Sequence, residues 1–335
     1  MRSISLPSRP GFPASGGTRG SLVYRAVALV LSAIILAGSL AVAGCSSESA
    51  PGGTLYPLDV TDLLGRPVEL TGVPQRIVTT HPTATEVLCS AGGLPVGCDS
   101  SSKYPPEVVG LPAVGSAYYL SVEAIAGLQP DLVIMEALTQ ARYLDSLSAL
   151  GVPVMAVRAA SLDDVVDSLK LVGKVIDRSE DAAAAVKDIE DRIEAAQASQ
   201  AASGLSRSVL VLIADEQGKI YAARADSYPG TIAGLLGLNN LAADMAGSGP
   251  FTGFAELTGE VLVGLDPDVI FTITPAPQPA PRLSALLPSL PVYRDKAAVK
   301  EGRLVELDPS LYLQAQGPRI ASAVEGMLQI MKGYE

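Results

Sequence analysis

The sequence predicts an α/β protein with two lobes of the same type, each built on a mainly parallel β-sheet, joined by one long helix. Three observations predict this fold class. Short β-rich segments alternate with helical segments in two separate stretches, one segment occurs twice in related form, and an almost wholly helical stretch lies between them. The body of about 280 residues that begins near residue 55 also exceeds what a single hydrophobic core usually holds, which favours two lobes.

Residues 1–44 are predicted to be a secretory signal. A basic leader precedes an apolar run from Ala26 to Ala43, and the sequence VAGC then ends at Cys45. This ending resembles the bacterial lipobox, in which cleavage before the cysteine leaves it for acylation. Cys45 is the predicted lipid anchor, and residues 45–55 the flexible tether. The alternative is a transmembrane helix, since the run is near the shortest spanning length, but the polar segment after Cys45 favours cleavage.

Cleavage would remove four arginines and no acid, which changes the net charge from −11 to −15. This charge argues against nucleic acid as a partner. No later apolar run is long enough to span a bilayer, so we expect a soluble body outside the cytoplasm. Cys89 and Cys98 could pair there, although two small buried thiols are the favoured interpretation.

The first lobe is predicted over residues 56–160. It begins with a hairpin, YPLDVTDLLGRPVEL, and continues with the strands RIVTT, PVGC, DLVIM and VPVMAV, which alternate with helices. Thr83 with Glu86 fits a capping box, and Ser121 fits a helix N-cap. The alternation indicates βαβ units and a parallel sheet.

Residues 161–203 are predicted to be helical and to include the connecting helix. Apolar residues recur there every three or four positions, from Ala182 to Ala196. The second lobe, residues 204–335, begins at RSVLVLI and ends with RLVEL and the helix GPRIASAVEGMLQIMKGY.

The repeated segment reads LSVEAIAGLQPDLVI in the first lobe and LTGEVLVGLDPDVIF in the second. Helices of βαβ units begin at the carboxyl edge of the sheet, where open α/β sheets bind ligands. Glu123 and Glu260 therefore lie at that edge, although an acid in a first turn is favoured by the helix dipole whatever its function. The Gly-Leu-x-Pro-Asp half, with Asp131 and Asp268, is predicted to be structural.

Several segments together resemble the class III, or helical-backbone, substrate-binding proteins of ABC importers for cobalamin, ferric siderophores and haem. They are PQRIVTTHPTATEVLCSAGG, KYPPEV, both repeats, the helical stretch and GPRIASAVEGML. The resemblance implies two Rossmann-like lobes with the ligand in a cleft between them. It also implies that Glu123 and Glu260 dock to arginines of the permease, with the ATPase subunits as further partners. We expect a monomer.

The resemblance leaves the cargo open among ferric siderophore, haem and cobalamin, and it implies no cofactor beyond the cargo. Cobalamin-binding members place tryptophans against the corrin, whereas this chain has no Trp. His81, the single histidine, is an axial-ligand candidate for haem or a structural residue. The predicted ligand-binding residues are His81, Tyr118, Tyr119, Tyr221, Arg224, Tyr228, Phe251 and Tyr312. Arg142 and Arg282 are weaker candidates.

An extracytoplasmic α/β enzyme that uses the same cleft is the alternative function. The sequence lacks the G-x-S-x-G, G-x-x-x-x-G-K-[ST] and H-E-x-x-H motifs, and a catalytic triad would have to use His81. One histidine without clustered cysteines also argues against a zinc site. A purely structural surface protein would not account for a cleft with Tyr, Arg and Phe, so the sequence favours a binding protein without catalytic residues.

Overall fold

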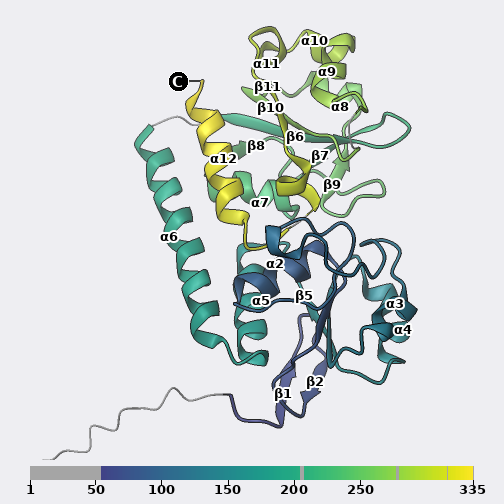
Figure 1. The fold of residues 1–335 in the computed structure, drawn as a ribbon. Helices are drawn as coiled ribbons and strands as arrows, with labels where there is room; N and C mark the ends of the chain where they lie inside the picture. The colour runs from purple at the N-terminus through teal and green to yellow at the C-terminus, as the bar shows by residue number, and fades with distance from the viewer. Residues whose placement is uncertain (1–53, 204–206, 277–278, 315, 335) are drawn as a thin grey trace, which may run out of the picture. The chain divides into compact units, whose positions relative to one another are not determined.

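The computed structural model describes residues 54–203, 207–276, 279–314 and 316–334 (Figure 1). The predicted signal, Cys45 and most of the predicted tether lie outside these residues. Within the described ranges, no helix has the length and apolar character needed to cross a membrane.

The first lobe begins with the predicted hairpin, β1 (Leu58–Thr61) paired antiparallel with β2 (Pro67–Leu70). The Asp62 carboxylate fixes its turn, because it accepts hydrogen bonds from the backbone of Leu64 and Arg66 and from the Ala156 N–H. The hairpin is thereby attached to the sheet of the first lobe.

That sheet is parallel, in the order β3 (Ile77–Thr79), β4 (Leu132–Glu136), β5 (Val154–Val157). The strand predicted at PVGC was wrong, since Gly97 and Cys98 make isolated bridges. Pro95 has no N–H to donate, and the chain turns at Asp99, so a longer ladder does not form. The helices of this lobe are α2 (Pro82–Ser90), η1 (Pro106–Val108), α3 (Val122–Gly127), η2 (Ala141–Tyr143) and α4 (Leu144–Ser148).

The second lobe contains a larger sheet in the order β11 (Leu304–Leu307), β10 (Val269–Ile273), β6 (Ser208–Ala214), β7 (Ile220–Ala223), β9 (Phe254–Glu256), and β8 (Asn239–Asn240) also pairs with β6. The strands β6, β8, β10 and β11 are parallel, whereas β7 and β9 run antiparallel to their neighbours. A tight turn at Asp215–Gly218 joins β6 to β7 and reverses the chain. The helical segments are α7 (Tyr228–Leu235), α8 (Gly259–Val263), α9 (Leu283–Leu286), η3 (Leu287–Ser289), α10 (Pro291–Arg294), α11 (Ala297–Lys300), the π-helix η4 (Ser310–Gln314) and α12 (Ile320–Lys332).

The predicted connecting helix is α6 (Ser179–Ser203), preceded by α5 (Leu162–Val175). Its apolar stripe is buried, and it packs on α5 and on α12, as Figure 1 shows. One hydrophobic cluster runs through α5, α6 and α12 and includes alternate residues of β4, such as Ile134, and of β10, such as Phe271. The two sheets therefore share a continuous core, although the predicted lobe boundaries at residues 160 and 204 stay a prediction.

The repeat forms the same local structure twice. Ser121 caps α3 by accepting a hydrogen bond from Ala124 N, and Thr258 caps α8 by accepting one from Val261 N. The aspartate of each repeat binds the start of the first strand of its sheet: Asp131 accepts from Gln75 N and Arg76 N, and Asp268 from Ser208 N. These contacts confirm that the second half of the repeat is structural.

Candidate functional site

Polar residues follow each strand of the first sheet at its carboxyl edge. His81 lies two residues after β3, Glu136 ends β4, and Arg158 follows β5. The Arg158 guanidinium donates two hydrogen bonds to Asp164 Oδ1, 2.8 Å from Nε and 2.5 Å from Nη2. This edge is the position where open α/β sheets bind ligands.

His81 is the N-cap of α2, because its Nδ1 accepts a hydrogen bond of 3.2 Å from Thr83 N. The predicted capping box of Thr83 and Glu86 was therefore wrong. The helix begins earlier, at Pro82, whose fixed φ and missing N–H suit the first helical position. Burial lowers the pKa of His81, although the carboxylates of Glu136 and Asp99 oppose that shift. His81 is thus a neutral imidazole with its proton on Nε2.

Gln140 joins three segments at this edge, and sequence reasoning missed it. Its Nε2 donates to the carbonyls of Thr80 and Ala117, at 2.7 and 3.0 Å, and its Oε1 accepts from Thr80 Oγ1. The neighbouring Glu136 carboxylate accepts three hydrogen bonds from Leu138 and Thr139. Because these groups are buried and satisfied, the edge is preformed. The sequence did carry a signal for Gln140, since a polar residue four positions after the buried strand β4 is expected at the carboxyl edge.

Tyr118 and Tyr119 are 63% and 81% exposed, on the loop that leads into α3. The loop backbone is nevertheless fixed, because the Tyr118 carbonyl accepts hydrogen bonds from Arg142 Nη2 and Tyr143 Oη, at 2.7 and 2.6 Å. Gly115 takes a φ of +103°, and a Cβ there would lie 2.2 Å from the Tyr119 carbonyl oxygen. The two rings therefore project from a rigid turn.

In the second lobe, three of the predicted residues lie close to β7. Tyr221 is buried and donates to Asp215 Oδ2 at 2.9 Å, and its ring meets the half-buried Phe251 edge-on at 5.1 Å. Arg224 follows β7 and forms a 3.4 Å ion pair with Asp226. In the described part of the chain, the buried Nε atom of Arg224 has no hydrogen-bond partner.

Tyr228 and Tyr312 are buried inside the shared core. Tyr312 donates its hydroxyl proton to the carbonyl of Ala323 at 2.9 Å, and burial raises the pKa of both tyrosines well above the usual value. Their ligand role stays a prediction, and their burial favours packing. The sequence shows that both residues are aromatic, but it does not show whether their side chains are buried in the core or exposed to a ligand.

Glu86 and Arg319 form an ion pair that links α2 to the residue before α12. Arg319 donates from Nε and Nη2 to the two carboxylate oxygens, at 2.8 and 2.7 Å, and from Nη2 to the Ser310 carbonyl. Glu86 is 2% exposed. Burial raises its pKa, although the hydrogen bonds and charge of Arg319 oppose that shift. Thr231 Oγ1 also donates to the Ala160 carbonyl between the two lobes.

Glu123 and Glu260 are both exposed, in the first turns of α3 and α8. No described residue forms a salt bridge with either, so each carboxylate is available to a partner. Their structural positions match the prediction, and their docking role stays a prediction.

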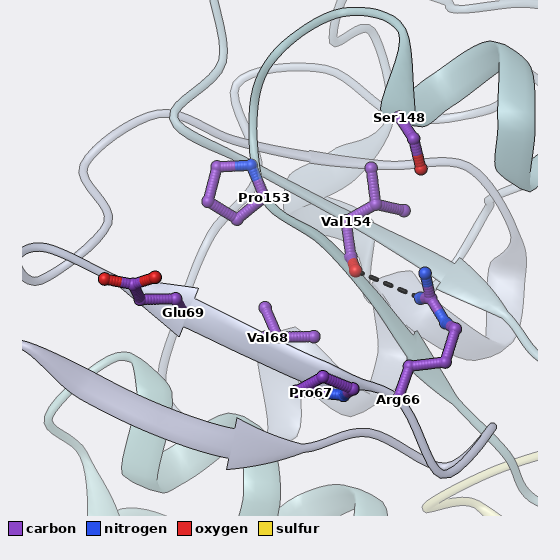
Figure 2. Close-up of a pocket in the computed structure, with 7 residues that line it drawn as sticks. All are labelled: Arg66, Pro67, Val68, Glu69, Ser148, Pro153 and Val154. Atoms are coloured by element: carbon purple, nitrogen blue, oxygen red, sulfur yellow. Dashed lines mark hydrogen bonds between the residues drawn. The ribbon is translucent and has the colours of Figure 1, made fainter.

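Two surface depressions lie at the opposite, amino edge of the first sheet. One, of about 200 Å³, is lined by residues that include Arg66, Glu69 and Val154, and Figure 2 shows the Arg66 guanidinium directed at the Val154 carbonyl. The other, of about 480 Å³, is lined by residues that include Ile77 and Asp177. Neither contains a residue of the carboxyl edges.

The described residues hold no cluster of three or more His, Cys, Asp or Glu that could bind a metal ion. Cys89 and Cys98 are free thiols. Burial raises the pKa of Cys98 to about 11 and that of Cys89 to about 12, so both remain protonated and unreactive at neutral pH. The favoured prediction of two small buried residues holds for Cys98, whereas Cys89 is half-buried.

Comparison with known proteins gives consistent results. A family model described as "Periplasmic binding protein" matches residues 77–311. An uncharacterized ABC transporter substrate-binding lipoprotein of Bacillus subtilis is 26% identical over 90% of this chain and 94% of its own length. A cobalamin-binding protein of Halobacterium salinarum is 27% identical over 93% of this chain and 84% of its own. The periplasmic heme-binding protein RhuT of Roseiflexus is 26% identical, with a TM-score of 0.68 over 77% of this chain and 98% of its own.

Proposed function

Since the chain belongs to the family of periplasmic binding proteins, we propose that it captures a corrinoid, such as cobalamin, and delivers it to the permease of an ABC importer. The observation that carries the choice of cargo is the combination of exposed tyrosines on the loop before α3 with arginines that are each paired with a carboxylate. The cobalamin-binding relative, similar over most of both chains, supports it. Ferric siderophore and haem are the other chelates against which the proposal is tested.

The charges favour a cargo without strong net charge. Arg158 lies at the carboxyl edge of the first sheet, Arg319 binds Glu86 of α2, and Arg224 follows the antiparallel strand β7. Each of the three is paired with a carboxylate. A polyanionic ferric siderophore or the two propionates of haem would have to compete with these carboxylates. Tyr118 and Tyr119 instead offer flat apolar rings with a polar tip, which suit a macrocycle surrounded by amide groups.

The tautomer of His81 also argues against haem ligation. Its Nδ1 accepts the Thr83 hydrogen bond, so the proton lies on Nε2. Ligation of iron through Nε2 would move that proton to Nδ1 and break the cap of α2. We therefore assign His81 a structural role, with Nε2–H available to donate a hydrogen bond to cargo.

Titration of the purified mature chain tests this function. Cyanocobalamin is expected to bind and to raise the melting temperature, because a ligand at 100 times its Kd stabilises the folded state by ~2.7 kcal/mol. Haemin and a ferric hydroxamate are titrated in parallel, with the visible spectrum and the melting temperature as readouts. Binding of haemin or the hydroxamate alone would replace corrinoid as the cargo. If none of the three binds, the metal-chelate function is wrong.

We further propose that Cys45 carries the lipid anchor. The first described residues are held firmly, since Thr54 N donates to Asp177 Oδ1 at 2.6 Å and Tyr56 Oη to the Val175 carbonyl at 2.6 Å. Thr54 and Tyr56 therefore lie beside the end of α5. A lipoprotein among the relatives supports the anchor.

Replacing Cys45 with serine is expected to move the protein from the membrane fraction to the soluble fraction, because acylation needs the thiol. Cyanocobalamin affinity should not change, since Cys45 precedes the folded body. The distribution is measured by fractionation and immunoblotting, with Cys89→Ser as the control. A Cys45→Ser protein that stays with the membrane would disprove the anchor.

A further inference from the structure

Tyr104 lies in the segment KYPPEV, between the bridge residue Cys98 and η1. The conformation of the loop before Tyr104 is fixed by hydrogen bonds, because Asp99 accepts from Ser101 N and Ser102 Oγ. Ser102 Oγ lies 2.9 Å from Thr85 Oγ1 on α2. Asp99, Ser102 and Thr85 are all buried, so the loop that presents Tyr104 is well ordered.

The Tyr104 ring rests on a cation from the other lobe. The Arg319 guanidinium carbon lies 4.7 Å from the ring centroid. That guanidinium is itself immobilised by both oxygens of Glu86 and by the Ser310 carbonyl. Although one of its faces is covered, Tyr104 remains 46% exposed. The ring therefore has one supported face and one accessible face.

This ring adjoins the other exposed aromatic residues of the first lobe. Ser100 N donates a 2.7 Å hydrogen bond to the Gly115 carbonyl, which joins the Tyr104 loop to the loop of Tyr118 and Tyr119. Gln140 binds the backbone of the second loop to the end of β3. Three exposed tyrosine rings thus lie on two connected loops next to the carboxyl edge.

We propose that Tyr104 packs against the conjugated ring of the bound macrocycle, and that Glu86 and Arg319 act as positioning residues for the tyrosine ring. This inference rests on the proposed function. A cation behind the ring withdraws electron density, which favours an electron-rich plane on its free face. The Arg319 guanidinium of the second lobe thereby holds the Tyr104 ring of the first lobe in the position from which it contacts the ligand.

The test compares Tyr104→Ala, Tyr104→Leu and Tyr104→Phe with the wild-type mature chain, using cyanocobalamin and haemin. Removal of the ring in Tyr104→Ala should raise the Kd for the bound macrocycle about 5- to 10-fold. Tyr104→Leu should lose nearly as much, whereas Tyr104→Phe should bind like wild type and keep the absorption spectrum of the bound chelate. Val109→Ala, an exposed apolar change just after η1, is the matched control and should have no effect.

Two results would overturn the assignment. One is a Kd for Tyr104→Ala equal to that of wild type. The other is an equal loss in Tyr104→Phe and Tyr104→Ala with a lowered melting temperature, which indicates a structural role. If wild type binds neither macrocycle, the proposed function itself fails and Tyr104 has no such ligand. A wild-type chain that binds while Tyr104→Ala is unaffected removes this inference and leaves the proposed function standing.

Discussion

Replacing Glu123 and Glu260 together with arginine is expected to abolish cargo uptake while cyanocobalamin affinity stays unchanged. Both carboxylates are exposed and form no salt bridge with a described residue, so the permease can supply an arginine to each. Charge reversal turns each attraction into a repulsion, and one charge pair at 4 Å contributes about 1 to 4 kcal/mol depending on its exposure. Loss of the acids from two first turns costs fold stability much less, ~0.3 to 1 kcal/mol each.

Uptake of labelled cobalamin by cells measures the first effect, and titration of the purified chain measures the second. Glu180→Arg with Glu216→Arg is the matched control, since both residues are exposed and Glu180 also lies in the first turn of a helix, α6. Uptake at the wild-type level in the Glu123 and Glu260 variant would exclude a docking role. A parallel loss of cobalamin affinity would mean instead that the two residues hold the site.

Replacing Arg319 with leucine is expected to lower the free energy of unfolding at pH 8 by about 3 kcal/mol. The physical reason is the Glu86 carboxylate, which is 2% exposed and would lose its charged partner. Removal of both charges, in Glu86→Leu with Arg319→Leu, should recover most of this loss because no uncompensated charge remains. Urea unfolding of the two single variants and the double variant completes the cycle.

The same cycle predicts a pH dependence. Burial already raises the pKa of Glu86 in the wild-type chain, and removal of Arg319 raises it further. A group with a raised folded-state pKa stabilises below its unfolded pKa, and that stabilisation is lost as the pH rises through the folded value. Arg319→Leu should therefore lose less stability, relative to wild type, at pH 5 than at pH 8. An equal loss at both pH values would show that Glu86 is not the source.

The features that depend on neighbours along the chain were predicted well. The alternation of β-rich and helical segments gave the two sheets, and the apolar spacing from Ala182 to Ala196 gave the buried stripe of α6. The caps at Ser121 and Thr258 followed from residue types suited to that position. The antiparallel strands β7 and β9 were not predicted, although the turn at Asp215–Gly218 carried a recognisable signal.

The candidate site was predicted less completely, because burial and pairing depend on distant residues. Tyr118 and Tyr119 were expected in the loop before a helix, and both rings are exposed there. Tyr228 and Tyr312 are of the same residue type but pack in the core. Gln140 and Tyr104 were missed because local spacing does not reveal their contacts, which are with Thr80 and with Arg319 respectively.

The sequence by itself identified the family through the segments that resemble it. It also determined the two α/β lobes and the position of Glu123 and Glu260 in matching first turns, because periodicity and capping are short-range properties of the chain. The tertiary structure decided the role of Glu86, which the local pattern assigned to a helix cap. Its partner, Arg319, lies 233 residues away along the chain. Only folding brings the two charges together. Because the Glu86 carboxylate is buried, the folded state would be strongly destabilised if that charge had no partner.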